Sequence, residues 1–167
     1  MFLRKSSQIQ RSEKSQPKYI QRIETARNGT NPAVVCKVPS GWVFLAHIQF
    51  FRGYCILQSD PIVASLNSLG QQQRGQYLSD MALIGDAILE ITTAYRINYA
   101  ILGNLEPVLH SHIAPRYADE RSEFLTGLPW SYPHKKLDSI VFDFARDKNL
   151  IEELSVILFW PLIVNLS

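Results

Sequence analysis

A long amphipathic helix near the middle of the chain constrains the fold most. Apolar side chains recur there at steps of three and four residues: Tyr77, Met81, Ile84, Ile88, Ile91 and Tyr95. This spacing predicts a helix with one apolar face. Ser68 followed by Gln71 is a capping-box pattern, so we expect the helix to begin at Ser68. Gly75 and Gly85 lie inside it, and each lowers helix stability by about 1 kcal/mol relative to alanine.

Short strand-like runs lie on both sides of this helix. They are rich in aromatic and β-branched residues and cover residues 33–38, 41–50, 54–58, 97–102 and 108–114. Strands joined by short turns pair in antiparallel fashion. The order therefore predicts an α+β fold: an antiparallel β-sheet with one long helix and a shorter one over Tyr19–Arg27. We expect Pro115 to end the last strand.

The two ends of the chain differ from its middle. Residues 1–30 hold seven lysines and arginines against two acids, so we predict a flexible basic tail over 1–18 and a domain over 19–135. Residues 136–167 form a C-terminal extension in which Asp138–Leu150 is expected to be helical. The apolar run Leu154–Leu166 has three open interpretations: it covers a dimer surface, packs on the sheet, or is poorly folded.

Composition narrows the class of function. The formal net charge of +2 argues against a bulk polyanion, so no nucleic acid is expected as partner. Leu154–Leu166 is interrupted by Pro161 and is shorter than the about 20 residues that span a bilayer, so no membrane partner is expected. Cys36 and Cys55 lie in apolar runs and are interpreted as buried free thiols. A cytoplasmic protein is the expectation.

The stretch Val108–Arg116 carries the candidate chemistry. Because alternate side chains of a strand share a face, His110 and His112 project together, about 7 Å apart along the strand. Local pattern alone leaves three interpretations: two half-buried structural histidines, a metal site, or nucleophilic catalysis at phosphorus. The metal site needs a third ligand, for which the loosely available residues are Asp60, Glu106, His47 and His134.

The run from Asn98 to Arg116, with its Leu-Gly-Asn-x-x-Pro-x-Leu-His-x-His order, resembles the histidine-triad family. Gly53-Tyr54-Cys-Ile-Leu57, Leu66-x-x-Leu69 and Pro129-Trp130 extend the resemblance over residues 31–133. It implies an antiparallel sheet with two helices, usually in a two-fold homodimer. It also implies action on nucleoside 5′-phosphates with a phosphate, sulfate or amine leaving group, without a metal or other cofactor.

The resemblance assigns roles to these histidines. His110 matches the nucleophile that would form a nucleotidyl-histidine intermediate, and His112 matches the last histidine of the triad. Val108 stands where the first should be, so one orienting contact is expected to be lost. The short link 103–107 replaces a glycine- and glutamine-containing loop, and Asn104 is the candidate contact to phosphate or leaving group, or simply a turn residue. Asp60-Pro61 stands where relatives often place another histidine.

Three further residues are candidates for binding the nucleotide. Trp42 and Phe44 share one strand face and would sandwich a base, with ordinary core packing as the alternative. Arg116 would pair with phosphate, or else form a salt bridge at the end of its strand. The leading hypothesis is a nucleotide hydrolase or transferase. The second is a catalytically weak or inactive nucleotide-binding or interaction module, and the third is an unrelated α+β protein with structural or metal-bound histidines.

Overall fold

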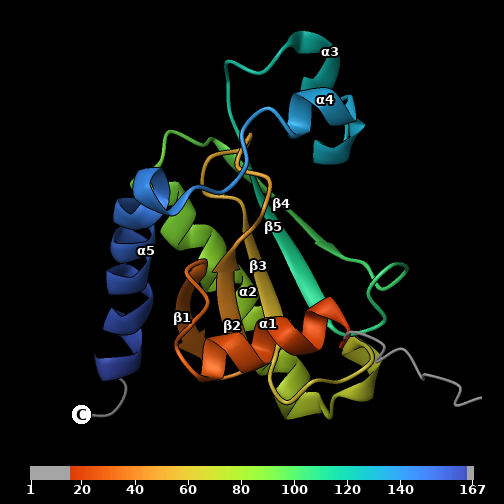
Figure 1. The fold of residues 1–167 in the computed structure, drawn as a ribbon, viewed down its shortest axis with the longest axis vertical. Coiled ribbons are helices and arrows are strands. Elements are labelled where there is room, and N and C mark those ends of the chain that lie inside the picture. The colour runs from red at the N-terminus through yellow and green to blue at the C-terminus, as the bar shows by residue number, and fades with distance from the viewer. Residues whose placement is uncertain (1–15, 165–167) are drawn as a thin grey trace, which may run out of the picture.

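The computed structural model describes residues 16–164 (Figure 1). The described elements follow one another as α1 (Lys18–Arg27), β1 (Val34–Val38), β2 (Gly41–Leu45), β3 (Cys55–Ser59), α2 (Gln71–Ile91), β4 (Arg96–Ile101), β5 (His110–Arg116), α3 (Ser122–Leu125), α4 (His134–Leu137) and α5 (Phe144–Val164). Two short 3-10 turns cover Leu66–Ser68 and Pro129–Ser131. The predicted α+β class is confirmed. Most of the predicted basic tail, residues 1–15, lies outside the described residues.

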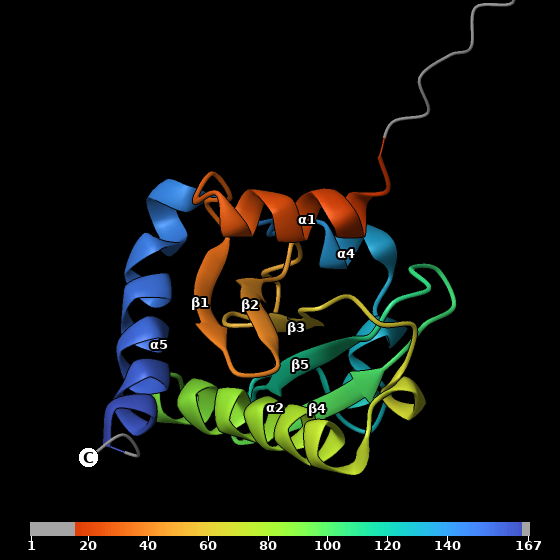
Figure 2. The same ribbon diagram turned by 90° about the horizontal axis from the view of Figure 1, so that it is seen from below.

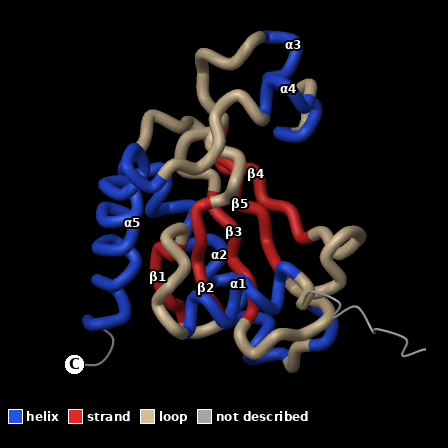
Figure 3. Tube along the Cα trace, viewed as in Figure 1, coloured by secondary structure: helices blue, strands red, loops and turns tan. Residues whose placement is uncertain are grey.

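The five strands form one sheet in the order β1-β2-β3-β5-β4, and every pairing is antiparallel (Figure 3). The long helix α2 carries the chain from β3 to the edge strand β4, and β5 then returns between them. β5 is therefore central, with a partner on each side. This position fixes the direction in which its alternating side chains point.

The helices cover both faces of the sheet. Figure 2 shows α1 on one side and α2 on the other, with α5 beside β1. Tyr77, Ile84 and Ile88 of α2 are fully buried against the side chains of β3 and β5 that point to that face. Ile23 and Ala26 of α1 bury a second, smaller apolar cluster on the opposite face. Asn28 and Gly29 follow α1 as expected, and Gly29 has φ +72°, which favours glycine.

The C-terminal helix packs on the domain. Leu150, Leu154 and Leu158 recur at four-residue steps along α5 and are buried in the same core as the α2 residues. Of the three interpretations of Leu154–Leu166, packing on the sheet describes residues 154–159, because Leu154 and Leu158 share a core with Val35 and Cys36 of β1. Residues 165–166 lie outside the described residues. Helix α5 thus shares a core with the predicted 19–135 domain. No helix within residues 16–164 is long and apolar enough to cross a membrane.

Two predicted boundaries near helix α2 and strand β2 were wrong. Helix α2 begins at Gln71, because Gly70 is the capping residue and its N–H donates to the Gln73 side chain, while Ser68 ends a 3-10 turn. Strand β2 ends at Leu45 rather than residue 50. The Gln49 amide, which is buried, donates to the carbonyls of Ala46 and Tyr54 and so holds residues 46–54 as a loop.

The missing N–H of Pro115 led to the prediction that the last strand ends there, and this prediction was wrong. Strand β5 continues through Pro115, which pairs with Ile97 of β4. Pairing with β3 stops at Ile113, so beyond that point β5 has β4 as its strand neighbour. Proline is tolerated where its missing donor faces an unpaired side of a strand.

Candidate functional site

The two histidines of β5 lie next to each other on one face, as predicted. Their ring centroids are 5.0 Å apart and the rings are nearly perpendicular. His110 is buried, with 7% of its surface exposed, and His112 is half-buried. Leu109, Ser111 and Ile113 point into the core on the opposite face. The alternation in the sequence therefore separates the candidate chemistry from the core.

The backbone of Val108 orients His110. The Nδ1 of His110 lies 2.9 Å from the Val108 carbonyl oxygen, which can only accept a hydrogen bond. Nδ1 therefore carries the proton, and Nε2 of the neutral ring keeps its lone pair. This contact uses the main chain of Val108, and the loss of a side-chain contact from a first histidine stays a prediction.

Tyr54 holds His112 in a defined state. The Tyr54 hydroxyl lies 2.5 Å from Nδ1 of His112. Burial raises the pKa of Tyr54, so the phenol keeps its proton near pH 7. Its O–H can donate to Nδ1 of His112, the arrangement in which the neutral imidazole carries its proton on Nε2. In that tautomer the Nε2–H can be donated to an oxygen anion.

His112 is neutral near pH 7. Burial lowers its pKa to about 4, and nearby His110 adds to the effect. Glu106 raises this pKa and Arg22 lowers it, so both charged groups lie within electrostatic reach of His112. A neutral imidazole beside the His110 ring avoids two adjacent positive charges. The pair is thus set up for one nucleophile and one hydrogen-bond donor.

The strand register places the aromatic candidates in rows with the histidines. Trp42 pairs with Gln58, which pairs with His110. One step along, Phe44 and Ile56 share the row of His112. Directly paired residues point to the same face of a sheet, so these side chains and the histidines share one surface.

Helix α1 covers the β2 end of these rows. Phe44 is 2% exposed and packs with Ile23 and Ala26 of α1. The Trp42 indole N–H donates to the Asp60 carboxylate, which also pairs with Arg27 of α1. Both aromatic side chains are therefore packed beneath a helix, the alternative recognised from the sequence.

Residues that sequence analysis did not assign to the site lie beside His110. The Arg22 guanidinium of α1 donates to the Gln58 side chain at 2.8 Å and to both oxygens of Glu106 at 3.1 Å. Gln58 is fully buried and sits opposite His110. A glutamine within an apolar strand was the available signal, whereas Arg22 resembles any solvated helix arginine.

Solved structures share this arrangement of elements, although no family model and no curated protein sequence matches the chain significantly. A histidine triad protein from Bradyrhizobium japonicum superimposes with a TM-score of 0.61 at 23% identity, over 75% of this chain and 89% of that one. One from Marinobacter aquaeolei gives a TM-score of 0.63 at 18% identity, over 83% and 93%. A zinc-bound family member from Mycobacterium smegmatis gives 0.53 at 18% identity, over 86% and 94%. This chain has the histidine-triad fold.

None of the four residues considered as a third metal ligand is placed to join His110 and His112. Asp60 is bound to Arg27 and Trp42, and Glu106 is bound to Arg22. His47 and His134 are exposed on other parts of the chain. Within residues 16–164, the histidines, cysteines and acids form no group of three or more that could hold a metal ion.

Arg116 and Asn104 lie outside the histidine cluster. All five N–H groups of buried Arg116 are occupied, by Glu120, Asn98 and the carbonyls of Gly127 and Phe124. This is the salt-bridging role, and it leaves no N–H for a phosphate. Asn104 is exposed in the link between β4 and β5.

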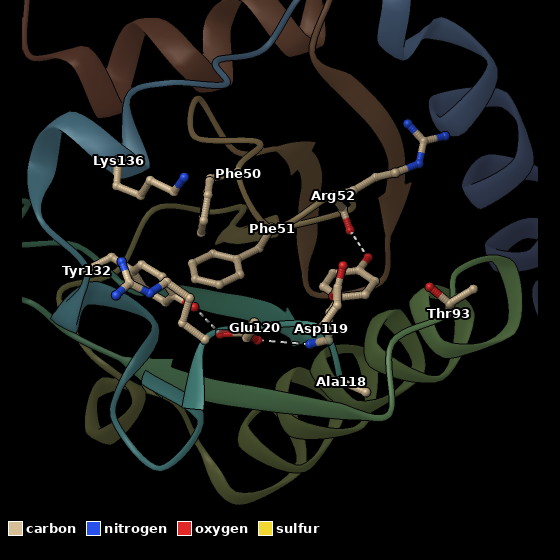
Figure 4. A pocket seen from close by; sticks show the side chains of 11 residues that line it. Phe50, Phe51, Arg52, Thr93, Ala118, Asp119, Glu120, Tyr132 and Lys136 are labelled. Carbon is tan, nitrogen blue, oxygen red and sulfur yellow. Dashed lines mark hydrogen bonds between the residues drawn. The ribbon is translucent and has the colours of Figure 1, made fainter. Parts of the chain in front are cut away.

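A cavity of about 630 Å³ lies at another part of this histidine-triad fold (Figure 4). Its walls combine aromatic and charged side chains, among them Phe50, Phe51, Arg52, Glu120, Tyr132 and Lys136. Neither histidine of the pair lines it. Its Glu120 carboxylate is the partner of Arg116 and also accepts from the Tyr132 hydroxyl. This cavity is therefore separate from the candidate site.

Proposed function

We propose that the protein is a nucleotide hydrolase or nucleotidyl transferase acting at the α-phosphate of a nucleoside 5′-phosphate derivative. Dinucleoside polyphosphates and nucleoside phosphoramidates are the substrate classes considered. The observation that supports this most strongly is the His110 geometry: Nδ1 is held by a backbone carbonyl, and the ring lies 5.0 Å from the second imidazole. One solved structure of the same fold is described as a nucleotide-binding protein.

The proposed reaction has two displacements. Nε2 of His110 attacks the α-phosphorus, a nitrogen–phosphorus bond forms, and the bond to the leaving group breaks with the electron pair on that group. A leaving phosphate departs as an anion, and a leaving amine takes up a proton from solvent as the bond breaks. Water then attacks the same phosphorus, the bond to Nε2 breaks, and the water proton passes to solvent. The nucleoside monophosphate is released and His110 returns to its starting tautomer.

His112 is proposed to stabilise the transferring phosphoryl group. With Nδ1 accepting from Tyr54, its Nε2–H donates to a phosphoryl oxygen whose charge grows during attack. A preoriented donor in a partly buried site acts without the reorganisation that water would require. Asn104 stays a proposed contact to phosphate or leaving group, and Trp42 stays a proposed wall for the base. Phe44 is 2% exposed beneath α1, so α1 would have to move before this side chain could contact a base.

A nucleotide-binding module with little or no turnover is the second candidate. Burial of His110 and the packing of Phe44 beneath α1 favour it, because both restrict access of a substrate to the site. In either case we propose a homodimer in the cytoplasm. The edge strand β4 exposes Tyr99 and Ile101 and has a free side on which a second copy would pair, and Cys36 and Cys55 are free thiols.

The test compares native protein with His110→Ala on diadenosine tetraphosphate and adenosine phosphoramidate, with exposed His134→Ala as matched control. We expect His110→Ala to lower turnover at least about 1,000-fold, as loss of a nucleophile does, and His134→Ala to leave it unchanged. An acid-labile nucleotidyl adduct should form on native protein and on His134→Ala but not on His110→Ala. Turnover that survives His110→Ala refutes the catalytic assignment, whereas binding of nucleoside monophosphate without turnover supports the module.

A further inference from the structure

Arg22 is a cation that acts electrostatically on His112, and the proposed reaction gives it no role. It lies on α1, and its side chain is about one quarter exposed at 27%. Its partner Glu106, 29% exposed, belongs to the link that leads into β5, two residues before the carbonyl that holds His110. The ion pair therefore joins the cover of the site to the strand that carries its chemistry.

The geometry of this pair is that of an anion site occupied by a protein carboxylate. Two guanidinium nitrogens of Arg22 donate to the two oxygens of Glu106, the fork arrangement in which arginine also binds phosphate. Within residues 16–164, Nε–H and one Nη2 hydrogen of Arg22 have no hydrogen-bond partner. Arg22 can thus accept a phosphate by exchanging one anion for another.

Gln58 fixes where that fork sits. Its side-chain oxygen accepts from Arg22, and its side-chain nitrogen donates to the Tyr19 carbonyl, so both ends of this buried amide are bound to α1. Gln58 and His110 are directly paired, which puts their Cβ atoms about 5 Å apart. When the α-phosphorus of a substrate lies at Nε2 of His110, the adjoining phosphate of the leaving group would be within reach of the Arg22 guanidinium.

We propose that Arg22 binds the leaving group, that Glu106 competes with it for Arg22, and that the preferred substrates have an anionic, phosphate-type leaving group. This inference rests on the proposed function. When the bond to the leaving phosphate breaks, that group takes the electron pair and gains negative charge, which the guanidinium stabilises. A neutral amine gives Arg22 nothing to bind, so the chain discriminates between the substrate classes through one residue.

The experiment measures kcat/KM for diadenosine tetraphosphate and for adenosine phosphoramidate with Arg22→Gln, Glu106→Gln and Arg27→Gln. Arg22→Gln should lower the value for the tetraphosphate about 10- to 100-fold, the usual effect of one charge-assisted hydrogen-bonded pair, and change the phosphoramidate value less than about threefold. Glu106→Gln should raise the tetraphosphate value, because the competing carboxylate is gone. The two members of one ion pair thus have opposite effects.

Arg27→Gln is the matched control for anchoring of the helix. It removes the second ion pair between α1 and the domain, with Asp60, and Arg27 has no contact with the histidines. Arg27→Gln should change kcat/KM for both substrates by the same factor. If Arg22→Gln also changes both equally, or if Glu106→Gln lowers the tetraphosphate value as Arg22→Gln does, the pair only holds α1 in place and the proposal is overturned.

A binding measurement separates this inference from the reaction on which it rests. Calorimetric titration with inorganic pyrophosphate needs no turnover, so it applies even if native protein cleaves neither substrate and the proposed function fails. We expect pyrophosphate to bind more weakly to Arg22→Gln and more tightly to Glu106→Gln than to native protein. Equal affinities in all three, with thermal unfolding showing each variant folded, refute the anion site.

Discussion

The two faces of the central strand β5 are built from the same seven residues and behave oppositely. On the α2 face, the Tyr77 hydroxyl donates to the Leu57 carbonyl and accepts from Ser111, all within an otherwise apolar core. On the α1 face, His110 and His112 meet Gln58, Tyr54 and the charged pair Arg22–Glu106. One face stabilises the fold, and the other brings together ionisable and hydrogen-bonding side chains.

The contrast teaches that polarity alone does not mark the site. Ser111 and Tyr77 are polar and fully buried, yet their hydrogen-bonding groups satisfy each other. On the other face, Nε2 of His110 and two N–H groups of Arg22 have no partner within residues 16–164. Unused hydrogen-bonding capacity next to a charge distinguishes the candidate site from the core.

The largest effect is expected from Leu154→Ala, which tests whether α5 belongs to the core face. Leu154 is fully buried, so removing its side chain should lower the free energy of unfolding by about 2–5 kcal/mol. Val156 of the same helix is 67% exposed. Val156→Ala should therefore change the free energy of unfolding by less than about 0.5 kcal/mol. Urea denaturation measures both. Similar small values for the two variants would mean that α5 is only loosely attached.

The pH dependence of stability should come from the site face. His112 takes up a proton near its ordinary pKa of 6.5 when unfolded, but only near pH 4 when folded. The unfolded state thus binds more protons between these values, and stability is full above pH 6.5 and falls as the pH drops toward 4. Between pH 7 and pH 5 we expect a loss of about 2 kcal/mol, from about 1.4 kcal/mol per pH unit below 6.5.

Denaturation of native protein, His112→Asn and His134→Asn at both pH values checks this expectation. Asparagine does not titrate, so His112→Asn should lose about 2 kcal/mol less than native protein. His134 is exposed, so His134→Asn should keep the native pH dependence. An unchanged pH dependence in His112→Asn would show that the imidazole is not buried in its neutral form.

A pair of tyrosine variants compares the two faces directly. Tyr77→Phe removes a buried hydroxyl and leaves Ser111 unsatisfied, so it should lower stability by about 1–3 kcal/mol and leave the pKa of His112 unchanged. Tyr54→Phe removes the donor that favours neutral His112, so it should raise that pKa. Unfolding and NMR titration of the imidazole distinguish them. Equal shifts of the pKa in both variants would contradict the separation of the faces.

The smallest effects concern the approach of α2 to the sheet. A Cβ at Gly85 would lie 1.9 Å from the Tyr99 hydroxyl oxygen, so Gly85→Ala should destabilise by about 1 kcal/mol because Tyr99 must move aside. Nothing lies within 4 Å of a Cβ at Gly75, and Gly75→Ala should stabilise the same helix by about 1 kcal/mol. Thermal unfolding measures both signs. A gain at Gly85 would show that α2 and β4 are not in close contact.

Local pattern was enough to predict elements whose periodicity is strong. The alternation of His110 and His112 and the α2 stripe from Tyr77 to Ile91 follow from the geometry of helices and strands, and both are observed. Tyr95, predicted on the same stripe, lies beyond the end of α2 and is 50% exposed. Limits of elements were predicted less well, because side-chain bonds and strand neighbours decide them. Gln49 bonds to main-chain carbonyls of its own loop and so ends β2, and pairing with β4 lets β5 continue through Pro115. His110 and His112 could be predicted because they are close together in the sequence, whereas Arg22 and Gln58, which lie on other elements, were not assigned to the site.

The sequence by itself determined that two imidazoles share a strand face and that one long helix packs on the other, because period and side-chain direction are local properties. Only the tertiary structure decided what meets those imidazoles. Arg22 and Glu106 are 84 positions apart, and Tyr54 and His112 are 58 apart. Such contacts depend on how the sheet orders its strands and where α1 crosses it, which no short stretch of chain encodes.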